Sequence, residues 1–79
     1  MTTSLKSQTI ATARAYESIL STPMSFGSRV QARRVYMEKL EMLKSKTESH
    51  EAKSLIGLAL KDVSDHQTVD FALRASEVI

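Results

Sequence analysis

Hydrophobic residues recur along this chain at helical spacing, and the pattern is densest in residues 65–79. Placed at about 100° per residue, these residues form one apolar side and a second one next to it. The polar positions are confined to a narrow stripe made of His66, Asp70, Arg74 and Glu77. A helix that is apolar around most of its circumference is either surrounded by its own core or covered by another chain.

We predict that part of this apolar surface is covered by a second copy of the chain, because a domain of 79 residues has little core of its own. The predicted oligomer interface consists of Val69, Phe71, Ala72, Leu73, Ala75, Val78 and Ile79. The alternative is that both apolar sides are buried inside one bundle.

The same periodicity continues through the rest of the chain and predicts four helices in all, at residues 4–20, 28–45, 48–63 and 65–79. The first helix should end near Thr22, because a residue that precedes proline is disfavoured in the helical conformation. The segment that contains Pro23 and Gly27 is predicted to be a loop.

A single long helix across the second and third segments is an alternative, because neither Gly nor Pro occurs between residues 28 and 56. The phase of the apolar positions argues against it. The seam that contains Tyr36 and Leu40 would continue into polar positions such as Glu51, while the apolar stripe of the third helix lies well over a quarter-turn away. A break at residues 45–49 places both stripes against one core.

Small polar residues mark where the predicted helices begin. Ser28 and Ser64 are each followed three residues later by a glutamine, which is the spacing of a capping box. Thr47 or Ser49 can cap the third helix. Helices with such short connections indicate an all-α fold, a small bundle that forms a single domain over residues 1–79 and that we expect to be oligomeric.

The composition is that of a small folded protein. Hydrophobic residues make up 42% of the chain and charged residues 25%, unlike a disordered sequence. Cysteine is absent, so neither disulfides nor a thiolate metal site can add stability. No apolar run approaches the roughly 20 residues that a membrane span needs, and the first ten residues do not resemble a secretory signal. We therefore expect a soluble cytoplasmic protein without membrane contact.

Charge is distributed unevenly along the chain. Residues 1–46 carry eight basic and three acidic side chains, a balance of +5, whereas residues 47–79 carry three basic and six acidic ones, a balance of −3. The two halves can attract each other, or the basic half can face an anionic partner. For the second case the predicted partner-binding residues are Arg29, Arg33, Arg34, Lys39 and Lys44.

Candidate chemistry is sparse. His50 and His66 are the only histidines, and both lie near predicted helix starts, where a solvated role is typical. His66 and Asp70 offer at most two metal ligands from one helix face, whereas zinc needs three or four. A pair between Asp70 and Arg74 at i, i+4 explains that stripe more simply. A catalytic triad is defined by geometry and not by inventory, so we expect no enzymatic activity, no metal and no cofactor.

These observations predict a small non-enzymatic interaction protein, a regulator or inhibitor, that self-associates through residues 65–79 and binds an acidic protein through residues 28–45. Nucleic-acid binding through the same basic helix, with Lys46 added, is an alternative, although its cations are spread around the helix. A second alternative is a small nucleotide-like anion bound near Arg29 and Phe26, with Met24 and Tyr36 as an apolar floor.

Overall fold

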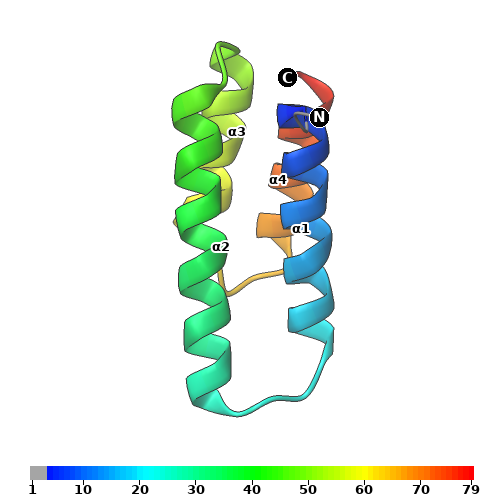
Figure 1. Cartoon of the computed structure of the whole chain (residues 1–79), viewed down its shortest axis with the longest axis vertical. Helices are drawn as coiled ribbons and strands as arrows, with labels where there is room; N and C mark the ends of the chain where they lie inside the picture. Colours follow the sequence, from blue (N-terminus) through cyan, green and yellow to red (C-terminus); the bar gives the residue numbers. More distant parts are fainter. Residues whose placement is uncertain (1–3) are drawn as a thin grey trace.

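The computed structural model describes residues 4–79, and within them four antiparallel helices are arranged in a ring (Figure 1). The helices are α1 (Leu5–Ser21), α2 (Phe26–Lys46), α3 (His50–Lys61) and α4 (Gln67–Glu77). Each helix packs against the next one along the chain, and α4 packs against α1, which closes the bundle. The prediction of an all-α bundle of four short helices is confirmed.

Two predicted helix ends are confirmed. Helix α1 ends at Ser21, and Thr22 adopts an extended conformation with φ −106° and ψ 129° ahead of the proline. The predicted break between the second and third helices lies between Lys46 and His50. There the Ser49 side chain accepts a hydrogen bond from the backbone N–H of Ala52 at 3.1 Å and caps α3.

The predicted start of the second helix at Ser28 is wrong. Helix α2 begins at Phe26, because Ser25 supplies the cap: its hydroxyl accepts a hydrogen bond from the backbone N–H of Ser28 at 3.3 Å. Ser28 is therefore the residue that is capped. As a result Phe26 and Gly27 belong to the first turn of the helix and not to the loop.

The predicted start of the fourth helix is also wrong. Ser64 does not cap it; the carboxylate of Asp65 accepts a hydrogen bond from the backbone N–H of Gln67 at 3.1 Å, and α4 begins there. Residues 62–66 form a connection between α3 and α4 in place of the sharp corner that the sequence indicated. Both helices of this second hairpin are shorter than predicted.

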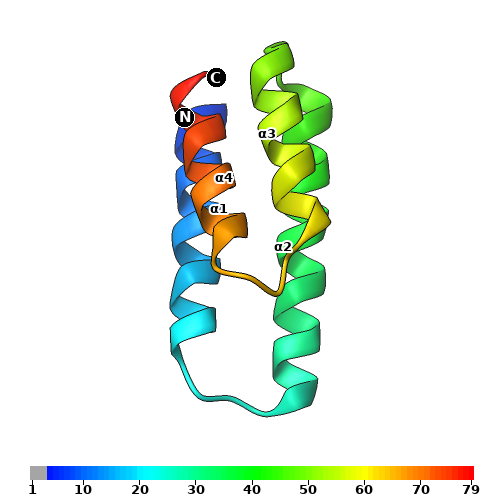
Figure 2. The same ribbon diagram turned by 180° about the vertical axis from the view of Figure 1, so that it is seen from behind.

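The core is built from inward side chains of all four helices, and α4 lies between α3 and α1 (Figure 2). The buried apolar residues are Ala13, Tyr16, Tyr36, Leu40, Leu43, Ala52, Ile56, Ala59, Val63, Val69, Ala72 and Ala75. Because α4 has a neighbour on each of two sides, both of its apolar sides are used within the chain. Contact of α4 with a second copy of the chain stays a prediction, because Phe71, Leu73, Val78 and Ile79 are only partly buried.

A search of residues 4–79 for a helix that is long and apolar enough to cross a membrane finds none.

Candidate interaction site

The two hairpins of the bundle differ in length, and this difference creates a free end. Helices α1 and α2 have 17 and 21 residues, whereas α3 and α4 have 12 and 11. At 1.5 Å per residue, α2 is about 31 Å long and α3 about 18 Å. The α1–α2 hairpin therefore extends beyond the α3–α4 connection, as Figures 1 and 2 show.

A hollow of about 180 Å³ opens at this free end, which we call the arginine hollow. Its lining residues are Tyr16, Ile19, Leu20, Phe26, Arg29, Arg33 and Ser64. Two guanidinium groups thus stand beside apolar and aromatic walls, and no carboxylate lies among the described residues that line the hollow. This combination suits an anionic group that is attached to an apolar one.

Two stacked tyrosines form the floor of the free end. The rings of Tyr16 and Tyr36 have centroids 4.0 Å apart and planes inclined by 7°. The Tyr16 hydroxyl donates a hydrogen bond to the carbonyl of Val63 at 2.6 Å. The pair therefore joins α1 and α2 to the α3–α4 connection, at the level where the shorter hairpin stops.

The Tyr36 hydroxyl belongs to a second, buried hydrogen-bond chain. The Thr68 hydroxyl donates to the carbonyl of Ala59 at 2.6 Å. Because the Thr68 hydroxyl has used its proton, it accepts a hydrogen bond from the Tyr36 hydroxyl at 2.9 Å. The Tyr36 hydroxyl also lies 3.2 Å from the backbone carbonyl of Thr68, which is a second acceptor. These contacts fix the α3–α4 connection against α2, and so they fix the base of the arginine hollow.

Burial raises the pKa of both phenols above their usual value of 10.0. For Tyr16 the nearby Arg33 and Arg29 partly oppose this effect. For Tyr36 the hydrogen bond with Thr68 lowers the pKa, while the Tyr16 side chain raises it further. Both phenols are therefore neutral hydrogen-bond donors at neutral pH.

Phe26 and Arg29 shape the outer edge of the arginine hollow. Phe26 is 80% exposed, the highest value among the large hydrophobic residues that the structure leaves at the surface. The guanidinium of Arg29 donates a hydrogen bond to the carbonyl of Thr22 at 3.2 Å, which ties it to the α1–α2 loop. Arg33 lies one helical turn further along α2 on the same side.

The structure separates the five predicted partner-binding cations. Arg29 and Arg33 share the arginine hollow. Arg34 lies on another side of α2, beside an open groove of about 390 Å³ that also contains Glu38 and Glu41. Lys39 lies on the side of α2 that faces α1, and the ammonium of Lys44 lies near Gly57 of α3.

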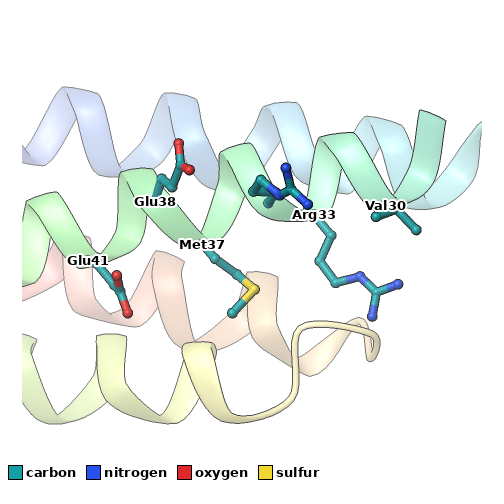
Figure 3. A pocket seen from close by; sticks show the side chains of 6 residues that line it. Val30, Arg33, Met37, Glu38 and Glu41 are labelled. Atoms are coloured by element: carbon teal, nitrogen blue, oxygen red, sulfur yellow. The ribbon is translucent and has the colours of Figure 1, made fainter. Parts of the chain in front are cut away.

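The groove beside Arg34 is larger than the arginine hollow, but its charges balance. It is lined by Val30, Arg33, Arg34, Met37, Glu38 and Glu41. In Figure 3, Met37 and Glu41 point from α2 toward α3, while Glu38 points to the opposite side of the helix. With two acidic and two basic groups in its lining, this groove has no preference for an anion.

Three of the seven predicted interface residues are core residues. Val69, Ala72 and Ala75 are buried against the chain itself, so they cannot contact a second copy in this fold. Phe71, Leu73, Val78 and Ile79 also pack against the core, but they remain partly exposed. For Val69, Ala72 and Ala75 the structure supports the alternative of burial within one bundle, because α4 has two neighbours, α3 and α1. For the other four residues, contact with a second copy stays a prediction.

The ion pair that was predicted on α4 is present. Arg74 and Asp70 lie 3.8 Å apart at i, i+4, both well exposed. Within residues 4–79, no cluster of three or more His, Cys, Asp or Glu side chains could hold a metal ion.

Sequence reasoning missed part of the arginine hollow. It proposed Met24 and Tyr36 as the apolar floor, whereas the structure uses Tyr16, together with Ile19 and Leu20 of α1. Tyr36 lies behind Tyr16 in the stacked pair. The inward stripe of the first helix already contained these α1 residues, but only the unequal helix lengths leave Ile19 and Leu20 partly exposed beside the buried Tyr16.

Comparisons of the chain with protein-family models, with curated proteins and with solved structures find no match.

Proposed function

We propose that this chain is an interaction module, acting by binding and not by catalysis, that recognises an acidic protein surface through the arginine hollow. The observation that carries the proposal is the exposed Phe26 beside Arg29 and Arg33, in a lining without a carboxylate among the described residues. Aromatic and arginine side chains are enriched among the residues that dominate binding energy at protein interfaces.

The size of the arginine hollow favours one side chain of a protein partner over a free nucleotide. Small-molecule sites generally occupy about 300–1,000 Å³, and this hollow holds about 180 Å³. A glutamate or aspartate side chain fits this volume. Its carboxylate can accept paired hydrogen bonds from a guanidinium, while neighbouring apolar groups of the partner cover Phe26.

The distribution of charge favours a protein over a nucleic acid. Nucleic-acid binding rests on several cations that follow the phosphate backbone. Here only Arg29 and Arg33 line the arginine hollow, and the groove that Arg33 shares with Arg34 also contains Glu38 and Glu41. Those two carboxylates would repel a phosphate backbone that ran along α2.

The test is a matched pair of charge reversals at adjacent positions. Arg33→Glu places a carboxylate in the arginine hollow, whereas Arg34→Glu makes the same change of net charge outside it. Binding is measured by fluorescence anisotropy against an array of acidic peptides that also contain hydrophobic residues, with single-stranded DNA as the competing probe. We expect Arg33→Glu to weaken peptide binding at least about tenfold, which is about 1.4 kcal/mol, and Arg34→Glu to leave it nearly unchanged.

Phe26→Ala is the second variant, because a side chain that is 80% exposed can be removed without disturbing the core. It should also weaken peptide binding. Equal losses for Arg33→Glu and Arg34→Glu would refute a localised site. Tighter binding of DNA than of every acidic peptide would refute the choice of partner.

A further inference from the structure

A second unpartnered surface lies on the face of the bundle that α1 and α2 share, the face turned toward the reader in Figure 1. Two adjoining hollows run along the junction of α1 and α2, the larger of about 390 Å³, and no residue of α3 or α4 lines either of them. We call this the outer face. Its exposed or partly exposed residues include Ala11, Ala15, Ala32, Val35, Lys39 and Met42.

The outer face is apolar, and its α1 side is flat. Val35 and Met42 are 40% and 41% exposed, although both are large hydrophobic residues. Opposite them, Ala11 and Ala15 allow the backbone of another helix to approach closely. The core of the chain uses neither Val35 nor Met42, so their exposure has no explanation within the monomer.

The charged residues on α2 indicate which kind of partner can bind to the outer face. Val35, Glu38, Lys39 and Met42 stand at i, i+3, i+4 and i+7 and so form one stripe on the surface of the helix. The stripe carries one acid and one base between two apolar residues. A uniformly acidic partner helix would be repelled by Glu38, and a uniformly basic one by Lys39.

A second copy of the chain supplies a base opposite Glu38 and an acid opposite Lys39, together with apolar residues opposite Val35 and Met42. If two α2 helices pack antiparallel about a two-fold axis that passes between Glu38 and Lys39, Val35 of each copy lies opposite Met42 of the other. In the same register Lys39 of each copy lies opposite Glu38 of the other. Every such contact occurs twice, as a two-fold interface requires. We infer that this chain forms a homodimer through the outer face, with α2 antiparallel to α2.

The size of the face sets the expected affinity. The length of α1 is about 25 Å and two helices side by side are about 20 Å wide, so each copy contributes on the order of 500 Å². This is less than the roughly 800 Å² per partner of a standard stable interface. The dimer should therefore dissociate in the micromolar range. By helical spacing, Arg29 and Arg33 lie away from the Val35–Met42 stripe of α2, so both stay accessible in the dimer.

The test is a charge swap followed by sedimentation equilibrium across micromolar concentrations. Glu38→Lys or Lys39→Glu alone places like charges opposite each other twice, and we expect each to raise the dissociation constant at least about fivefold. The double variant Glu38→Lys/Lys39→Glu restores opposite charges and should return the constant to within about twofold of the original. Rescue by the double variant requires this register and this orientation of the two helices.

A matched pair of aspartate substitutions at exposed apolar residues tests where the dimer interface lies. Val35→Asp should abolish dimerisation, while Leu58→Asp, at a residue of α3 that is 43% exposed, should not. Circular dichroism confirms that each variant is folded, and the charge-swap series does not alter the core. A chain that is monomeric at hundreds of micromolar, or a double variant that fails to restore the dimer, would overturn the proposal. Equal losses for Val35→Asp and Leu58→Asp would also overturn it.

Discussion

Replacing Thr68 by valine tests whether the buried hydrogen-bond chain holds the short hairpin in place. Valine has nearly the same shape as threonine, so the substitution removes a hydroxyl without opening a cavity. Thr68 is 1% exposed, and its hydroxyl donates to the Ala59 carbonyl at 2.6 Å. That carbonyl lies in the last turn of α3, where carbonyl groups have no partner within the helix.

The cost of Thr68→Val follows from this accounting. The Tyr36 hydroxyl keeps an acceptor in the Thr68 carbonyl at 3.2 Å, but the Ala59 carbonyl is left buried without a donor. Such a group costs about 1–3 kcal/mol. A domain of this length has a free energy of unfolding of about 4–12 kcal/mol. The variant should therefore lose a substantial part of its stability and melt about 4–8 °C lower for each kcal/mol lost.

Thr9→Val is the matched control. Thr9 is as deeply buried, at 0% exposure, but its hydroxyl donates to the Leu5 carbonyl at 2.7 Å within α1. In a regular helix that carbonyl already accepts the backbone N–H four residues on, so it keeps a partner when the hydroxyl is removed. Urea unfolding followed by circular dichroism should show a much smaller loss for Thr9→Val. If Thr68→Val costs no more than Thr9→Val, the role assigned to Thr68 is wrong.

Two further expectations concern stability. Gly57→Ala should raise the free energy of unfolding by about 0.5–1 kcal/mol, because glycine is unfavourable inside a helix and an added Cβ meets only the Lys44 ammonium at 3.6 Å; a lower Tm would contradict this. The raised pKa values of Tyr16 and Tyr36 mean that the unfolded chain loses these protons first as pH rises. The stability that the two protonated phenols contribute is fully present below about pH 10.0. It is lost as the pH rises through the higher pKa values that the phenols have in the folded chain. Thermal melts across that range should show the loss, and they should show less of it for Tyr16→Phe/Tyr36→Phe.

The architecture was largely readable from the sequence because helical periodicity is a local property. The inward stripe of Tyr36, Leu40 and Leu43 is buried as its spacing indicated. The starts of α2 and α4 were misplaced because several polar residues compete for one cap. Ser25 and Ser28 both suit an N-cap, and spacing alone does not choose between them.

The candidate sites were harder to predict because they depend on how helices are placed beside one another. Five basic residues on one helix formed a single group in the sequence, but only Arg29 and Arg33 line the arginine hollow in the structure. In the same way, α4 has the apolar surface that its sequence indicated, but much of this surface packs against two neighbouring helices, α3 and α1. Nothing local to residues 65–79 reveals how many neighbours that helix has.

The unequal hairpins also have a consequence for local opening. Amide groups at the free end of the α1–α2 hairpin are protected by two helices, whereas those further along α1 and α2 are enclosed by four. Hydrogen exchange should accordingly be faster at the free end, through fluctuations that leave the rest of the bundle closed. The outer edge of the arginine hollow, which contains Phe26 and Arg29, can therefore adjust its shape with little effect on the folding of the whole chain.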